Sequence, residues 1–110
     1  MKKLNIIKKE QEINDIINTG KRLYNRYYYI YNKENNSNKY YRFCICVSKK
    51  LGNAVIRNKN KRQVKDIIDK SNLSFKRNQD YVIILRKDIN SIDFEQKKNE
   101  LLSLLEQLGE

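Results

Sequence analysis

Residues 49–65 read KKLGNAVIRNKNKRQVK, a stretch with seven basic residues, no acidic residue and a single glycine. It joins a strand-like segment to a helical pattern, so Gly52 stands where a strand gives way to a helix. Residues 35–65 contain nine Lys or Arg and no Asp or Glu, and therefore carry +9 of the formal +11 charge. Excess charge concentrated in one block predicts a surface that binds a polyanion.

Residues 54–69 have a helical period, because apolar side chains recur at i, i+3 and i+4: Val64, Ile67 and Ile68. Basic residues also recur every four positions and form a separate stripe, which consists of Arg57, Lys61 and Lys65. Asn58 and Arg62 stand beside this stripe. A loop of Gly and Asn ahead of a helix presents free backbone N–H groups, and adjacent cations can grip phosphate there. A solvated helix face is the simpler alternative, but the absence of acidic residues favours nucleic acid.

The rest of the chain supplies the elements of an α+β fold. A helix is predicted over residues 10–18, ending at Gly20, and strands over 27–31, 40–48 and 80–86. The polar segment 32–38 looks like a hairpin connection between the first two strands. A closing helix over 93–108 has Asp93 as its N-cap and Gly109 after it. We therefore predict one domain, residues 1–110, built as a two-layer sandwich in the order α-β-β-(β)-α-β-α.

Two strand faces are candidate ligand surfaces. In the 40–48 strand, alternate positions from Tyr41 to Val47 form the predicted core face, which leaves Cys44 and Cys46 on a small-to-polar face suited to an RNA groove. We interpret these cysteines as reduced, semi-buried side chains. Three tyrosines share one side of the 27–31 strand, and bases could stack on their rings: Tyr27, Tyr29 and Tyr31. Packing within the protein is the commoner role of such rings.

Several function classes find no support in the sequence. No stretch approaches ~18 consecutive apolar residues, so no membrane span is expected, and the basic start of the chain lacks the apolar run of a signal peptide. The chain contains no His, no nucleophile elbow and no phosphate-binding P-loop, and its acids are dispersed. We therefore expect a cytoplasmic protein without catalytic residues, metal ligands, a cofactor or a small-molecule substrate of its own.

The motif VSKKLGNAVIRNKNKR at residues 47–62 resembles the signature of the bacterial ribonuclease P protein subunit, including its Arg-Asn-x-x-Lys-Arg core. Asn25-Arg26 before an aromatic strand, the run DYVIILRK at residues 80–87 and the closing helix match as well, so the resemblance covers nearly the whole chain. It implies a rare left-handed β-α-β crossover and a further short strand near residues 22–24. It also implies a protein that binds a catalytic RNA and helps that ribozyme remove the 5′ leader of precursor tRNA.

The resemblance assigns site residues by motif match. The RNA subunit would contact nine residues of the turn and helix: Lys49, Lys50, Gly52, Asn53, Arg57, Asn58, Lys61, Arg62 and Lys65. A cleft between the first helix and the sheet would receive the single-stranded leader. This cleft would be lined by Ile13, Ile17 and Tyr31, and Arg86 and Lys87 would lie near the cleavage-site end. The family commonly has aromatic residues at the positions of Ile13 and Ile17, so weaker stacking is expected. Mg²⁺ would be used by the RNA of the holoenzyme, not by this chain.

Two other classes fit the residues less well. A structural RNA-binding protein, such as a small ribosomal protein, would carry a similar charge block, but it would copurify with ribosomal RNA. A DNA-binding regulator has less support, since the sequence shows no helix-turn-helix and no dimerisation face.

Overall fold

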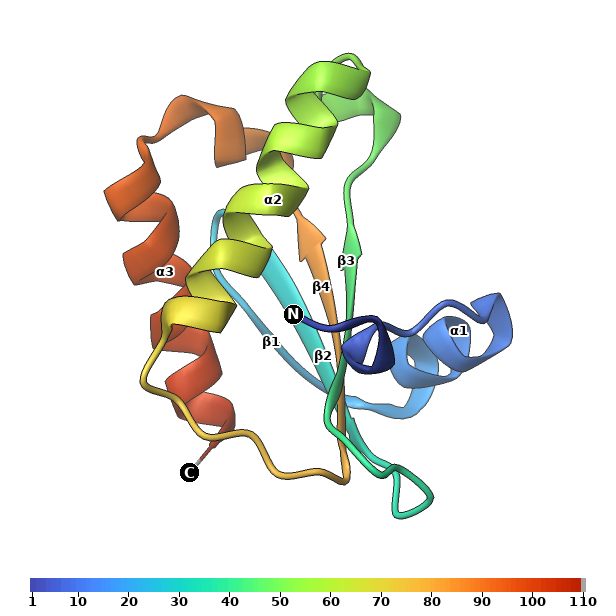
Figure 1. The fold of residues 1–110 in the computed structure, drawn as a ribbon. Helices are drawn as coiled ribbons and strands as arrows, with labels where there is room; N and C mark the ends of the chain where they lie inside the picture. Colours follow the sequence, from blue (N-terminus) through green and yellow to red (C-terminus); the bar gives the residue numbers. More distant parts are fainter. Residues whose placement is uncertain (110) are drawn as a thin grey trace.

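Helical and extended segments alternate much as the sequence predicts (Figure 1). The computed structural model describes residues 1–109, with elements α1 (Glu10–Thr19), β1 (Lys21–Tyr24), β2 (Tyr28–Glu34), β3 (Arg42–Cys46), α2 (Ala54–Lys70), β4 (Gln79–Leu85) and α3 (Phe94–Leu108). Three short 3₁₀ turns join them: η1 (Lys3–Asn5), η2 (Lys49–Leu51) and η3 (Lys87–Ser91). The short strand expected near residues 22–24 is β1, and Asp93 caps α3 by accepting a hydrogen bond from the Gln96 N–H at 2.9 Å.

The strands described in residues 1–109 form one mixed sheet in the order β1-β2-β4-β3. β1 pairs with β2 and β2 with β4 in antiparallel fashion, whereas β3 and β4 are parallel. The predicted hairpin across residues 32–38 is therefore wrong, because β4 lies between β2 and β3. The amides of Asn35 and Asn38 instead donate to the Asp80 carboxylate at 3.3 and 2.7 Å, which anchors this loop to the start of β4.

The connection from β3 through α2 to β4 is a left-handed crossover. Figure 1 shows both strands running upward, with β4 to the left of β3 and α2 in front of the sheet. Parallel β-α-β units are right-handed in about 98% of cases, so the hand is unusual. This is the crossover that the resemblance to the ribonuclease P protein implies, and it places the N-terminal end of α2 directly after the top of β3.

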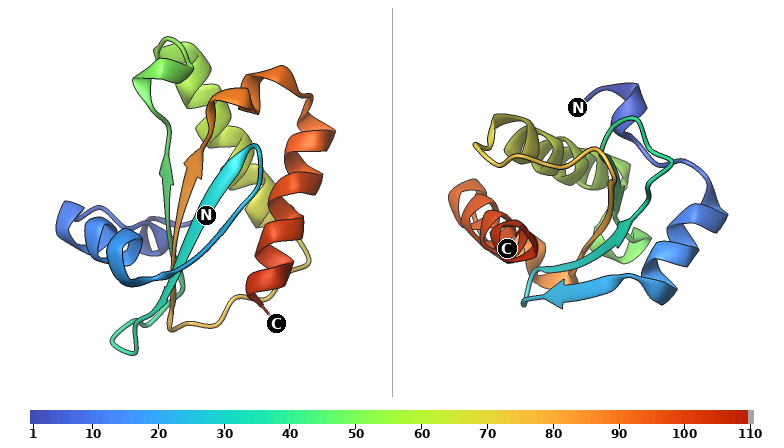
Figure 2. Two further views of the ribbon diagram at one scale, coloured as in Figure 1. Left: turned by 180° about the vertical axis from the view of Figure 1, so that it is seen from behind. Right: turned by 90° about the horizontal axis from the view of Figure 1, so that it is seen from below.

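The α+β class is as predicted, but each face of the sheet carries its own helical layer, which makes three layers in place of the predicted two (Figure 2). α2 and α3 cover one face, where the larger core contains the most deeply buried side chains, among them Tyr28, Ile30, Phe43, Ile83 and Leu101. The core face predicted for the 40–48 strand is confirmed, since Tyr41, Phe43, Ile45 and Val47 all pack there. α1 lies on the opposite face over a smaller cluster centred on Ile7, Ile16 and Val82.

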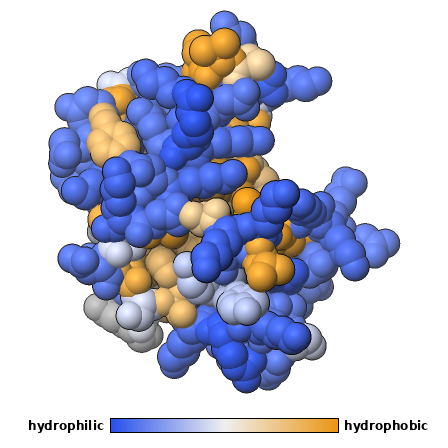
Figure 3. All heavy atoms as spheres, viewed as in Figure 1, coloured by the Kyte–Doolittle hydropathy of each residue, from blue (hydrophilic) through white to orange (hydrophobic). Residues whose placement is uncertain are grey.

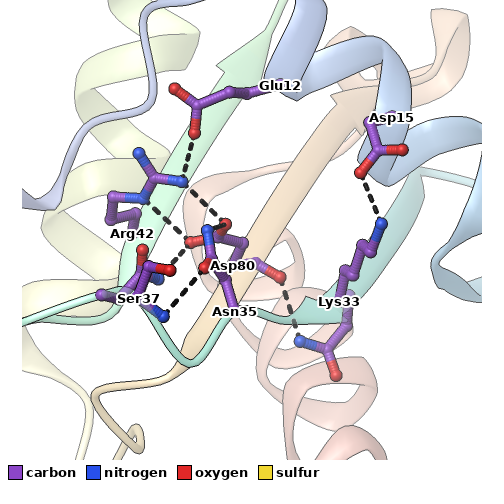
Figure 4. A network of polar contacts seen from close by, with 9 residues as sticks. Glu12, Asp15, Lys33, Asn35, Ser37, Arg42 and Asp80 are labelled. Atoms are coloured by element: carbon purple, nitrogen blue, oxygen red, sulfur yellow. Dashed lines mark hydrogen bonds and ion pairs between the residues drawn. The ribbon is translucent and has the colours of Figure 1, made fainter.

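A buried ionic network fixes α1 to the sheet (Figure 4). The Asp80 side chain is only 3% exposed and accepts hydrogen bonds from Nε and Nη2 of Arg42 at 3.0 and 2.8 Å. Arg42 Nη2 also donates to Glu12 of α1 at 2.6 Å. Burial alone would raise the pKa of Asp80, but the hydrogen bonds from Arg42 and from the two loop amides outweigh it and lower that pKa.

Candidate nucleic-acid interface

The turn before α2 brings two exposed lysines next to the start of the helix. Ser48 Oγ accepts a hydrogen bond from the Lys50 N–H at 3.0 Å, and Lys49 and Lys50 are both exposed in η2. Asn53 is the N-cap of α2, because its side chain accepts from the Ile56 N–H at 3.0 Å. The cations and the start of the helix thus meet within one short segment, as an anion-binding site requires.

Gly52 has the one positive φ among residues 1–109, at 140°. That backbone conformation is strained for any residue with a Cβ. A Cβ at this position would also lie 3.0 to 3.2 Å from three carbon atoms of the Ile56 side chain. The turn therefore requires glycine on both conformational and steric grounds.

The predicted basic stripe lies on the side of α2 that faces β3. Lys61 and Lys65 line a hollow beside Cys44, and Asn58 is exposed on the same helix. Arg57 is half-buried, and its Nε is fully buried without a hydrogen-bond partner within residues 1–109. We call Arg57, Lys61 and Lys65 the α2 stripe. A buried guanidinium nitrogen without a partner is costly. Because Arg57 as a whole is only half-buried, the exposed part of its side chain can meet an external acceptor such as phosphate.

Arg62 lies on the flank of the α2 stripe that turns towards α3. It lines a separate hollow on the α3 side, together with Lys59 and Phe94. The helical period turns Arg62 well away from Arg57, five positions earlier, but keeps it next to Lys65, three positions later. α2 is therefore cationic on two sides rather than along one stripe, and Figure 3 shows a largely hydrophilic surface in the view where α2 lies in front.

A buried polar cluster holds the start of α2 in place, and the sequence analysis missed it. Asn60 is 3% exposed; its amide donates to Ile56 O at 3.1 Å and to Asn90 Oδ1 at 3.0 Å. Asn90 in turn donates to Leu51 O at 2.8 Å, and Lys97 Nζ donates to Asn60 Oδ1 at 3.2 Å. Burial, and then the charge of Lys59, lower the pKa of Lys97. The only sequence signal was an Asn at a position where the helical pattern calls for an apolar residue.

The structure brings the three predicted cleft-lining residues together on the α1 side of the sheet. They belong to one half-buried cluster, which we name the α1 cleft after the predicted leader site and which consists of Ile13, Ile17, Tyr31, Cys44, Cys46 and Ile84. The two cysteines are free thiols with their Sγ atoms 3.6 Å apart. The side of the 40–48 strand that carries Cys44 and Cys46 thus contributes to this cluster.

Arg86 and Lys87 follow β4 at the end of the sheet that α1 leaves open. Arg86 Nη1 donates to Asn25 O at 2.6 Å, and its guanidinium lies 4.5 Å from the centroid of the Tyr29 ring. Lys87 is exposed at the start of η3. The shared side predicted for three tyrosines is wrong for Tyr27, which precedes β2 and is 8% exposed in the larger core.

Residues 1–109 contain no group of three or more His, Cys, Asp or Glu side chains placed to hold a metal ion. No helix in that range is both long and apolar enough to cross a membrane. The side chains described above are cations, amides and rings, which are groups that bind and orient a nucleic acid.

Comparison with known proteins places the chain among similar sequences and folds. The Ribonuclease P family model matches residues 1–109. The chain is 35% identical over 104 residues to the ribonuclease P protein component of Bacillus pumilus, which covers 94% of this chain and 87% of the relative. A solved structure of the RNase P protein of Staphylococcus aureus has a TM-score of 0.84 at 32% identity and covers 94% of both chains. That of Thermotoga maritima has a TM-score of 0.80 at 30% identity, over 92% of this chain and 94% of the other.

Proposed function

The chain belongs to the ribonuclease P protein family, and we propose that it is the protein subunit of a bacterial ribonuclease P. In this proposal η2, the α2 stripe and Arg62 bind the catalytic RNA, and the α1 cleft receives the single-stranded 5′ leader of precursor tRNA. The holoenzyme is an endoribonuclease whose cleavage chemistry belongs to the RNA subunit and its Mg²⁺. The protein works in the cytoplasm, where it supplies charge and position.

One observation carries the proposal. Lys61 and Lys65 line the same hollow as Cys44, and Cys44 also belongs to the α1 cleft. The two surfaces therefore adjoin across β3, which is the edge strand of the sheet. An RNA held on α2 and a second RNA strand held in the α1 cleft would lie side by side, which is the arrangement that a ribozyme and its substrate need.

The charge distribution also supports a protein that binds RNA and leaves cleavage to the RNA subunit. Two RNAs that approach each other repel through their phosphates, and a protein that neutralises phosphates lowers that repulsion. The cations of η2 and α2 form no ion pair within residues 1–109 except Lys70 with Asp66. Their charge therefore remains available to phosphate.

Copurification from cells tests the proposed partner. An affinity-tagged chain should enrich ribonuclease P RNA and precursor tRNA over ribosomal RNA, and a variant with Arg57→Met and Lys61→Met should lose most of that enrichment. Enrichment of ribosomal RNA in place of ribonuclease P RNA would contradict the proposal and favour a structural ribosomal protein.

A further inference from the structure

Aromatic and cationic side chains alternate across the open end of the sheet, beyond the α1 cleft. Tyr24 of β1 and Tyr29 of β2 are direct partners in the strand register, and their ring centroids lie 5.8 Å apart. The Arg22 guanidinium lies 5.1 Å from the Tyr24 centroid and 5.7 Å from the Tyr29 centroid. Arg86 lies 4.5 Å from the Tyr29 centroid. We call these four residues the β1-edge ladder.

The β1-edge ladder lies on the same face of the sheet as the α1 cleft. Leu23 packs against the larger core on the side of α2 and α3, so its neighbours Arg22 and Tyr24 point to the opposite face. Arg22 is paired in register with Tyr31, which belongs to the α1 cleft. The ladder thus continues the cleft to the free edge of the sheet at β1.

The ladder is open to a ligand and is already ordered. Tyr24 is 58% exposed, which leaves ring surface free for a further planar group. The hydrogen bond from Arg86 to Asn25 O, at 2.6 Å, fixes that guanidinium over Tyr29. Neither Arg22 nor Arg86 forms an ion pair with any group in residues 1–109.

We propose that the β1-edge ladder is a nucleobase-stacking subsite for single-stranded RNA, which extends the α1 cleft towards β1. Tyrosine rings and guanidinium planes both stack on unpaired bases, and the two cations offset the phosphates that such bases carry. Within the cleft, α1 offers Ile13 and Ile17, which cannot stack as rings do. The ladder therefore supplies aromatic contacts that α1 lacks. Identification of the strand as a tRNA leader rests on the proposed function, but stacking requires only single-stranded RNA.

A fluorescence titration of the full chain tests the stacking directly. The chain contains no Trp, so Tyr24→Trp introduces a unique indole into the ladder. A single-stranded oligoadenylate should quench the indole emission, because a stacked base lies against the ring, whereas an abasic ribose-phosphate strand of equal length should not. Tyr40→Trp is the matched control, since Tyr40 is 51% exposed and precedes β3 at the opposite end of the sheet. Its emission should not change with either strand.

Affinity measurements complete the test. Tyr24→Leu keeps apolar bulk but removes the ring, so the affinity for the oligoadenylate should fall about tenfold, within the range expected for one stacked base. Tyr24→Phe should restore the affinity. Equal quenching by the abasic strand, or an unchanged affinity of Tyr24→Leu, would overturn the subsite. Neither result bears on copurification with ribonuclease P RNA, so failure of the subsite is distinguishable from failure of the proposed function.

Discussion

Arg57 differs from the other cations of α2 because part of its charged group is enclosed by protein. Its Nε is buried without a partner, while Lys61 and Lys65 extend into the hollow beside β3. The sequence predicted the α2 stripe, because the four-residue spacing of its cations places them on one side of a helix. It also predicted Arg62 beside the stripe, and Arg62 stands three positions before Lys65, on the flank of α2 that turns towards α3.

Replacement of Arg57 by Met should weaken binding to the RNA subunit and reduce the slope of log affinity against log salt by roughly 0.7 to 0.9, the value for one phosphate contact. The free energy of unfolding should change little. Lys76→Met removes the same charge from an exposed position in the loop before β4 and should leave the slope unchanged. Equal slopes for wild type and Arg57→Met would show that Arg57 does not contact phosphate.

Gly52→Val should lower the free energy of unfolding by about 1–3 kcal/mol, because valine at φ 140° is strained and its Cβ meets Ile56. RNA binding should fall as well, since the turn carries Lys49 and Lys50. Gly109→Ala is the control, because φ there is −77° and a Cβ would lie no closer than 3.6 Å to its neighbours. Chemical denaturation and RNA titration check both effects, and a Gly52→Val variant as stable and active as wild type would contradict them.

At the scale of elements, the ionic network decides how β4 enters the sheet. Alternation and apolar runs predicted every strand of the larger core, but nothing local in the sequence showed that β4 lies between β2 and β3. The placement depends on contacts between distant residues, chiefly Asp80 with Arg42 and the loop amides. A single acid at the start of an otherwise apolar strand was the available signal, and its meaning depends on partners that only the fold brings close.

The network predicts a specific acid sensitivity. The pKa of Asp80 is lowered in the folded chain, so its stabilisation is complete above the unfolded value of about 3.9 and is lost as the pH falls through the folded pKa. Asp80→Asn should cost roughly 3 kcal/mol at pH 7, because Arg42 loses its buried partner. The difference in unfolding free energy between wild type and Asp80→Asn should shrink below pH ~3.9. A difference that stays constant from pH 7 to pH 2 would contradict the account.

Ile17 tests the cleft formed by α1 and the sheet. Ile17→Asp places a negative charge where leader phosphates would pass, so precursor tRNA should bind more weakly than with Ile17→Asn, which has nearly the same shape and no charge. Both variants should bind mature tRNA equally well, because it has no leader. Equal affinity of the two variants for precursor tRNA, measured where both remain folded, would show that the leader does not pass Ile17.

At the scale of the whole molecule, the left-handed crossover sets the geometry of the two proposed RNA-binding surfaces. It puts α2 after β3 at the edge of the sheet, so the α2 stripe adjoins the α1 cleft across a single strand. Charge and periodicity predicted the α+β class and the cationic block. The handedness came from the family resemblance alone, since hydrophobic patterns are the same for either hand.

Reconstitution of precursor tRNA cleavage shows whether the chain assists a catalytic RNA. The purified chain alone should not cleave precursor tRNA, and the cognate RNA alone should cleave it only at high Mg²⁺. Addition of the chain should restore cleavage at low Mg²⁺, because its cations offset the repulsion between the two RNAs. Cleavage by the RNA-free protein, or an Mg²⁺ requirement that the protein does not change, would contradict the account.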